Sequence, residues 1–269
     1  MLNLEITAPG TRVPPLPDPS DPHATVWRDQ AGTVCAWGQT VNGEHWIHVP
    51  AVAAFVFFPD RPTVSAVAAE AADRDLLEDA FRRTVLPLAL QAQGRQVLHA
   101  SAAEIDGRVA AFCALSGTGK STVAGALSRR GHALWADDAV CFEIAGRTVV
   151  ARGLPFALRL RPESAQLLGG DGADRSEAAP PDKPLAAVFV LERAPAGTGV
   201  QVIPLPQAEA FRAAMTHGYC FTLADADHRR AMIGDYFDLV ERVPVHRLRF
   251  EPGLGQLDEM LDAIEGIVP

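Results

Sequence analysis

The feature that most constrains the fold is a glycine-rich segment between an apolar run and a short helical pattern. Residues 109–114 (VAAFCA) are typical of a buried strand, and residues 123–131 (VAGALSRRG) predict a helix closed by a glycine. Residues 115–122 between them read LSGTGKST. A strand, a turn ending in Gly-Lys-Ser and a helix together hold nucleotide phosphates, because loop N–H groups and the helix N-terminus face the anion. The segment predicts a nucleotide triphosphate site.

The loop assigns roles to its own residues. In this Walker A pattern Lys120 reaches the outer phosphates, and the hydroxyl of Ser121 is a ligand of Mg²⁺. The first glycine of the strict pattern is replaced by Ala114, which is tolerated if its φ is negative and would cost roughly 1–2 kcal/mol in the left-handed region. The predicted nucleotide-binding residues are Ser116, Gly117, Thr118, Gly119, Lys120, Ser121 and Thr122.

Composition and charge exclude several classes of function. The 269 residues are 48% hydrophobic, enough for a sizeable core, and the formal net charge is −9. An acidic chain lacks the basic face that a nucleic-acid groove needs, and no run of Lys or Arg favours an anionic membrane. The longest apolar stretch, residues 51–58, is too short to span a bilayer, and no signal peptide is recognisable. We expect a cytoplasmic protein with four free cysteines and without nucleic-acid or membrane partners.

The chain is expected to be α/β, with a β-rich N-terminal segment at residues 1–93 and a P-loop domain with a mixed central sheet at 94–269. The N-terminal segment is expected to end in a helix that Asp73 caps. Pro87 should kink this helix or shift its boundary, and Gly94 should end it.

Within the second part, Asp106-Gly107 predicts a hairpin between strands at 96–105 and 108–113. A polar, Gly- and Pro-rich stretch at 169–184 predicts a mobile loop. The other predicted elements are strands at 133–136, 140–144, 148–151, 186–193, 200–205 and 245–250, and helices at 207–216, 226–242 and 256–266.

Two adjacent acids follow the strand after the P-loop helix. Asp137 and Asp138 stand where a P-loop protein holds Mg²⁺ or its water shell, and a second carboxylate there can accept a proton from an attacking hydroxyl. An ordinary turn or helix N-cap is the structural alternative. His99 lies in the strand whose hairpin partner enters the loop, so its side chain is a candidate for the same site.

Three arginines and a lysine are weaker candidates. Arg152 follows the second hairpin, and an arginine fork suits phosphate or carboxylate recognition. Arg159 and Arg161 fit surface positions better. Lys183 is equally compatible with a lid over the γ-phosphate and with a solvated linker.

Taken together, His99, the loop, Arg130-Gly131-His132 and residues 136–140 (ADDAV) resemble the catalytic domain of bacterial HPr kinase/phosphorylase. The loop is also similar to that of ATP-dependent phosphoenolpyruvate carboxykinase, whose unusual P-loop fold the kinase family shares. Residues 98–102 (LHASA) resemble a stand-alone subgroup, some of whose members phosphorylate a serine hydroxyl of a lasso-peptide precursor.

The resemblance implies an ATP- and Mg²⁺-dependent serine kinase. It assigns Asp137 as general base and Asp138 to Mg²⁺, and it places His99 and Arg152 with Lys120 in the catalytic site. The related kinases assemble into oligomers, so it also allows a homo-oligomer, although no surface stripe in the sequence demonstrates one.

Two departures from the family bear on the acceptor. The family usually has Glu where this chain has Thr122, and its Glu-x-Arg-Gly signature falls at residues 150–153 (VARG), without the Glu. That signature concerns the regulatory protein substrate and the reverse reaction, so its loss favours a different acceptor, and we expect a serine of a peptide. A small-molecule kinase and a non-catalytic nucleotide-binding regulator stay open as alternatives.

Overall fold

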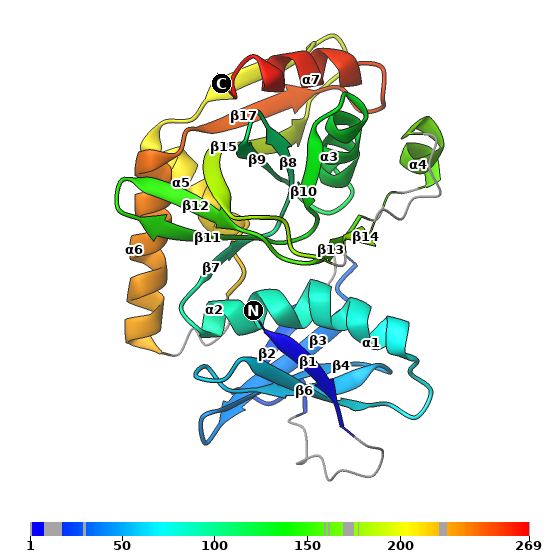
Figure 1. The fold of residues 1–269 in the computed structure, drawn as a ribbon, viewed down its shortest axis with the longest axis vertical. Helices are drawn as coiled ribbons and strands as arrows, with labels where there is room; N and C mark the ends of the chain where they lie inside the picture. The colour runs from blue at the N-terminus through cyan, green and yellow to red at the C-terminus, as the bar shows by residue number, and fades with distance from the viewer. Residues whose placement is uncertain are drawn as a thin grey trace. The chain divides into compact units, whose positions relative to one another are not determined.

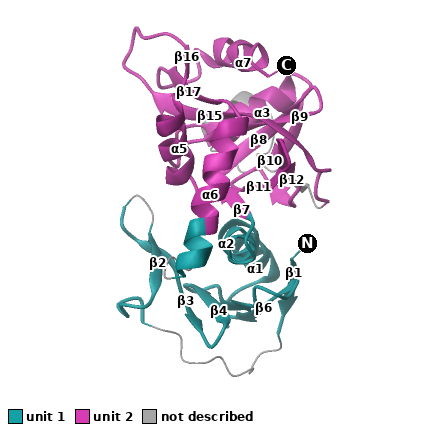
Figure 2. Cartoon of the chain, turned by 90° about the vertical axis from the view of Figure 1, so that its left-hand side faces the viewer, with its two compact units in different colours: residues 1–95, 220–230 teal, residues 96–219, 231–269 magenta. Residues whose placement is uncertain are grey.

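The computed structural model describes residues 2–7, 18–28, 31–158, 160, 162–168, 175–176, 178–220 and 225–268. The chain divides into two compact units, shown in Figure 2. The first comprises Met1–Arg95 with Cys220–Arg230, and the second comprises Gln96–Tyr219 with Ala231–Pro269. Among the described residues, no helix is both long and apolar enough to cross a membrane.

The first unit contains a six-stranded sheet in the order β1-β6-β5-β4-β3-β2 (Figure 1). β1 pairs with β6 in parallel and the other neighbours are antiparallel. The turn between β3 and β4 uses Asn42 and Gly43, both with positive φ, as a tight hairpin requires. The expected β-rich character is therefore confirmed. The strands are β1 (Asn3–Ile6), β2 (Thr25–Arg28), β3 (Val34–Val41), β4 (Glu44–Val49), β5 (Ala53–Phe57) and β6 (Thr63–Ala68).

The helix that follows has three parts: α1 (Arg74–Ala80), a π-helical turn η1 (Phe81–Val85) and α2 (Leu86–Ala92). The carboxylate of Asp73 accepts a hydrogen bond from the N–H of Leu76, which confirms the predicted cap. Pro87 lacks an N–H, so the regular hydrogen-bond ladder is interrupted just before it, where the helix widens. The helix continues past Pro87 to Ala92, and its irregularity is the π-helical turn just before the proline.

The second unit is built on a mixed sheet in the order β10-β8-β9-β15-β12-β11-β7, with β17 and β16 branching from β15 (Figure 1). β15 is parallel to β9 and to β17, and the other pairs are antiparallel. The expected α/β class with a mixed sheet is confirmed. The strands are β7 (Gln96–Leu98), β8 (Ala100–Ile105), β9 (Arg108–Cys113), β10 (Ala133–Ala136), β11 (Val140–Ala145), β12 (Thr148–Arg152), β15 (Lys183–Arg193), β16 (Gln201–Pro204) and β17 (Val245–Phe250).

The remaining elements are helices and one small sheet. β13 pairs with β14 outside the main sheet. The boundary between the two units falls within α6. These elements are β13 (Phe156–Ala157), β14 (Arg175–Ser176), α3 (Lys120–Arg129), α4 (Pro162–Leu168), α5 (Gln207–Thr216), α6 (Ala226–Arg242) and α7 (Leu257–Glu265).

The prediction of one strand over 96–105 is wrong at its centre. β8 does pair with β9 through the Asp106-Gly107 turn, but β7 pairs with β11, at the other end of the strand order. His99 is the residue between them, and its N–H donates to the carbonyl of His217 at 2.7 Å instead of continuing a strand. The chain therefore changes neighbours at His99.

The predicted loop at 169–184 contains strand β14 (Arg175–Ser176), and β15 already begins at Lys183. Residues 169–174 and 177 of that stretch, and also Arg159 and Arg161, lie outside the described residues.

The P-loop helix is anchored on the sheet and on the C-terminal helix. α3 packs over β8 and β10 and against α7, above a core that includes the stacked rings of Phe112 and Phe189. At the C-terminal end of α3, Arg130 contacts three α7 carboxylates at 2.5–3.1 Å, those of Asp258, Asp262 and Glu265. The helix that follows the loop is thus held by packing on the sheet and by ion pairs at its far end.

Candidate functional site

The loop leaves β9 and enters α3 with the backbone geometry of a phosphate-binding turn. Gly117 and Gly119 have φ of 79° and 130°, a region that side chains disfavour, and Gly119 is the N-cap of α3. Ala114 is not among the non-glycine residues with positive φ. The methyl at the first position of the motif therefore causes no backbone strain.

Lys120 is buried and folds back over the loop. Its ammonium group donates to the carbonyl oxygen of Ala114 at 3.0 Å, and only 6% of the residue is exposed. A buried ammonium beside the loop amides makes this turn a site of positive potential. An anion such as a phosphate is therefore the expected occupant.

Asp137 lies beside the helix start. Its Oδ1 accepts hydrogen bonds from Ser121 Oγ at 2.7 Å and from Ser101 Oγ at 2.6 Å. Ser101 comes from β8 and is fully buried, and Asp137 is only 6% exposed. Two strands and the P-loop helix therefore meet at one carboxylate, whose contact with Ser121 the sequence did not specify.

Asp138, the next residue, has a different environment. Its φ of 65° is unusual for a residue other than glycine, and Oδ1 lies 3.8 Å from Nε2 of His99. The His99 side chain is 39% exposed and that of Asp138 is 17% exposed. The structure thus brings His99 to the aspartate pair, and this half of the site is open to solvent.

A segment that the sequence did not indicate also borders the site. Residues 217–219 (His-Gly-Tyr), after α5, form an isolated bridge with β7 through Leu98 and Gly218. The Tyr219 hydroxyl donates to the carbonyl of Asp138 at 3.2 Å. Burial lowers the pKa of His217, and the nearby positive charge of Lys120 lowers it further. No local pattern marks these residues, because their role comes from contacts with distant parts of the chain.

Arg152 is placed differently from the other candidates. Its guanidinium pairs with the carboxylates of Glu143 and Asp182. The hydrogen bond to Glu143 has the largest effect in raising the pKa of Arg152, and the bond to Asp182 raises it further. The next residue, Gly153, has a structural role, since a Cβ there would lie 1.7 Å from the carbonyl oxygen of Pro180. The Arg-Gly pair thus ties β12 to the chain before β15.

Three other side chains have defined partners. Thr122 Oγ1 lies 2.8 Å from Ser164 Oγ of α4. Arg193, at the end of β15, donates to the carbonyl of Gly117 at 2.7 Å. Lys183 lies at the opposite end of β15 and pairs with Glu104 at 2.6 Å, so its interpretation as a lid lysine is not supported.

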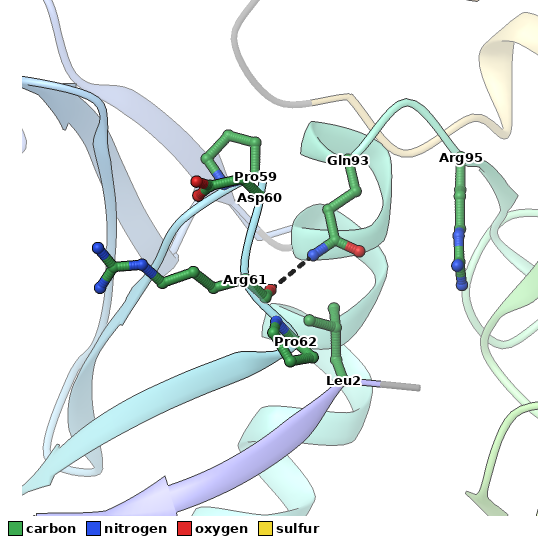
Figure 3. Close-up of a pocket in the computed structure, with 7 residues that line it drawn as sticks. All are labelled: Leu2, Pro59, Asp60, Arg61, Pro62, Gln93 and Arg95. Carbon is green, nitrogen blue, oxygen red and sulfur yellow. Dashed lines mark hydrogen bonds between the residues drawn. The ribbon is translucent and has the colours of Figure 1, made fainter.

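The first unit has a pocket of about 310 Å³, lined among others by Leu2, Asp60, Pro62, Gln93 and Arg95 (Figure 3). The Gln93 amide donates to the carbonyl of Arg61 at 2.9 Å. The Arg61 side chain extends away from the other lining residues and lies over the ring of Phe58. We assign this pocket no ligand.

Among the described residues there is no group of three or more His, Cys, Asp or Glu side chains that could hold a metal ion. No family model matches this chain, and no curated protein matches it. Among solved structures, the chain is similar to the Hpr(Ser) kinase/phosphatase from Coxiella burnetii, with 14% sequence identity and a TM-score of 0.35. That match covers 64% of this chain and 93% of the other. Function is therefore inferred from the site itself.

Proposed function

We propose that this chain is a phosphotransferase that moves the γ-phosphate of ATP, with Mg²⁺, to a hydroxyl group. The observation that carries the proposal is the meeting of Lys120, Ser121 and Asp137 at the start of one helix, with Asp138 and His99 beside them. A phosphate-binding turn alone is compatible with simple nucleotide binding. A second carboxylate next to a histidine adds a group that can take a proton from an acceptor.

The donor side fits ATP and Mg²⁺. The Ser121 hydroxyl and the Asp137 carboxylate are hard oxygen ligands 2.7 Å apart, and Mg²⁺ is commonly held by one or two such groups together with phosphates and water. When bound, the ion would neutralise charge on the phosphate oxygens. Lys120 and the loop N–H groups would hold the outer phosphates and stabilise charge on the transferred group.

The contacts of the aspartate pair favour the reverse of the roles expected from the sequence. Asp137 is buried and held by two serine hydroxyls, one of them the metal-binding serine of the motif, so we place it on the metal side. Asp138 and His99 are the more exposed groups. We therefore propose that the Asp138 carboxylate accepts the proton of the incoming hydroxyl, with His99 beside it.

For the acceptor we propose a serine of a peptide, and a lasso-peptide precursor within that class. The support is the resemblance of the sequence motifs and the loss of the glutamate associated with the regulatory-protein substrate. Arg152 is held by Glu143 and Asp182, so we propose no contact between its guanidinium and the phosphate.

The test is mass spectrometry of serine-containing peptides and of free serine after incubation with the purified protein, ATP and Mg²⁺. Phosphate on a peptide serine supports the proposal, and phosphate on free serine alone would favour a small-molecule kinase. ATP binding without any transfer would favour the regulator.

Two isosteric variants separate the roles of the aspartates. Asp138→Asn should lower kcat by about 10²–10⁴-fold with ATP binding retained, which is the range for loss of a general base. Asp137→Asn should raise the Mg²⁺ concentration needed for half-maximal rate. The opposite pattern would restore the assignment expected from the sequence.

A further inference from the structure

We infer that Tyr219 is a positioning residue for the transfer reaction, holding Asp138 and His99 in their working arrangement. The inference rests on the proposed function, in which Asp138, with His99 beside it, accepts the proton of the incoming hydroxyl. Tyr219 contacts both members of the pair, one through its hydroxyl and one through its ring.

The backbone of the segment is fixed against β7. The N–H of His99 donates to the carbonyl of His217 at 2.7 Å, and the N–H of Tyr219 donates to the carbonyl of Val97 at 2.9 Å. Gly218 lies between these two bonds, and a Cβ there would be 2.6 Å from the hydroxyl of the buried Tyr236. Only glycine allows so close an approach. The segment therefore carries Tyr219 to one place beside the site.

The hydroxyl of Tyr219 acts on the backbone of Asp138. It donates to the Asp138 carbonyl at 3.2 Å, where that residue has a φ of 65°. A left-handed backbone is unfavourable for aspartate and persists only where the surroundings hold it. This conformation sets the direction of the Asp138 side chain, whose Oδ1 lies 3.8 Å from His99 Nε2. The bond from Tyr219 thus helps to aim the carboxylate.

The ring of Tyr219 acts on His99. The two ring centroids are 5.7 Å apart at an angle of 45°, a tilted packing that limits the positions open to the imidazole. The histidine side chain is 39% exposed, and the Tyr219 ring packs against it. One side chain therefore constrains both groups.

The chain offers a matched control in Tyr236. Its hydroxyl also donates to a backbone carbonyl, that of Val97, at 2.9 Å, and its residue is fully buried. Tyr219→Phe and Tyr236→Phe each remove one such bond within the same unit. Only the first removes a bond to Asp138.

The experiment compares kcat, the KM for ATP and thermal unfolding for the wild type and both variants. Tyr219→Phe should lower kcat about five- to tenfold, the change expected for one hydrogen bond expressed in the transition state, with the KM for ATP unchanged. Tyr236→Phe, which keeps the bond to Asp138, should unfold at lower temperature and lower kcat less than Tyr219→Phe does. Equal kcat in Tyr219→Phe and the wild type would overturn the inference.

A second measurement does not depend on activity. The His99 ring resonance in a ¹H–¹³C NMR spectrum, assigned with His99→Gln, should move in Tyr219→Phe and move less in Tyr236→Phe. Absence of transfer by the wild type would refute the proposed function. A moved His99 signal would still support the positioning contact, and an unmoved signal would overturn it.

Discussion

The hydrogen bond from Ser101 to Asp137 gives a prediction that needs no substrate. The serine is fully buried and the carboxylate is only 6% exposed, so water cannot readily replace the hydroxyl in Ser101→Ala. Hydrogen bonds to charged groups contribute about 1.5–3 kcal/mol to stability, against about 0.5–1.5 kcal/mol for neutral ones. Asp137 keeps its bond from Ser121, so the variant removes the Ser101 bond to the carboxylate and a longer contact of 3.4 Å between the Ser101 and Ser121 hydroxyls.

The matched control is Ser164→Ala. Ser164 is also a buried serine, and it faces the loop residue Thr122 at 2.8 Å, but its partner there is a neutral hydroxyl. Ser101→Ala should therefore destabilise the second unit by about 1.5–3 kcal/mol and Ser164→Ala by about 0.5–1.5 kcal/mol.

Hydrogen–deuterium exchange is a suitable assay because it reports on each unit separately. The slowest amides of β8 and β9 exchange through global opening, so their rates follow the unfolding free energy. They should exchange roughly ten- to a hundredfold faster in Ser101→Ala and roughly two- to tenfold faster in Ser164→Ala. Equal rates in the two variants, or slower exchange in Ser101→Ala, would refute the idea that Asp137 is a buried charge held by this bond.

Two further predictions concern stability. Gly153→Ala should destabilise the protein by about 1–3 kcal/mol, because the added Cβ meets the backbone carbonyl of Pro180. Gly234→Ala is the control, since a Cβ there meets open space and should not destabilise the protein. Urea unfolding measures both changes. Burial lowers the pKa of His246, and its ring nitrogens have no hydrogen-bond partner among the described residues. Below the ordinary histidine pKa of 6.5, His246 therefore binds a proton more readily in the unfolded chain than in the folded one. Stability should then be highest above pH 6.5 and fall on acidification, and His246→Phe should reduce that fall in thermal unfolding measured from pH 7.5 to 5.5; an unchanged slope would contradict it.

Local patterns predicted much of the fold. The helices at 207–216 and 226–242 and the strand at 245–250 have the expected bounds, because each is a periodic segment between clear breaks. The hairpin at Asp106-Gly107 also followed from its two residues, whose positive φ suits a tight turn. These are features that a short window of sequence contains.

What the sequence did not predict depends on distant partners. The break at His99 arises from a hydrogen bond to His217, and the contact of Tyr219 with Asp138 also joins parts far apart in the chain. Lys183 suited a lid by composition, but its partner Glu104 holds it at the far end of its strand. The sequence thus indicated Lys120, Ser121 and both aspartates as candidates. Only the structure shows that Asp137 contacts Ser121 and that Asp138 faces His99.

The most direct test of the central claim follows the phosphate itself. The protein is incubated with Mg²⁺, a serine-containing peptide and ATP labelled with ¹⁸O in the γ-phosphate, and the products are analysed by mass spectrometry. Labelled phosphate should appear on the peptide serine and should be lost in Asp138→Asn. Label found only in free phosphate, or retained entirely in ATP, would contradict the claim.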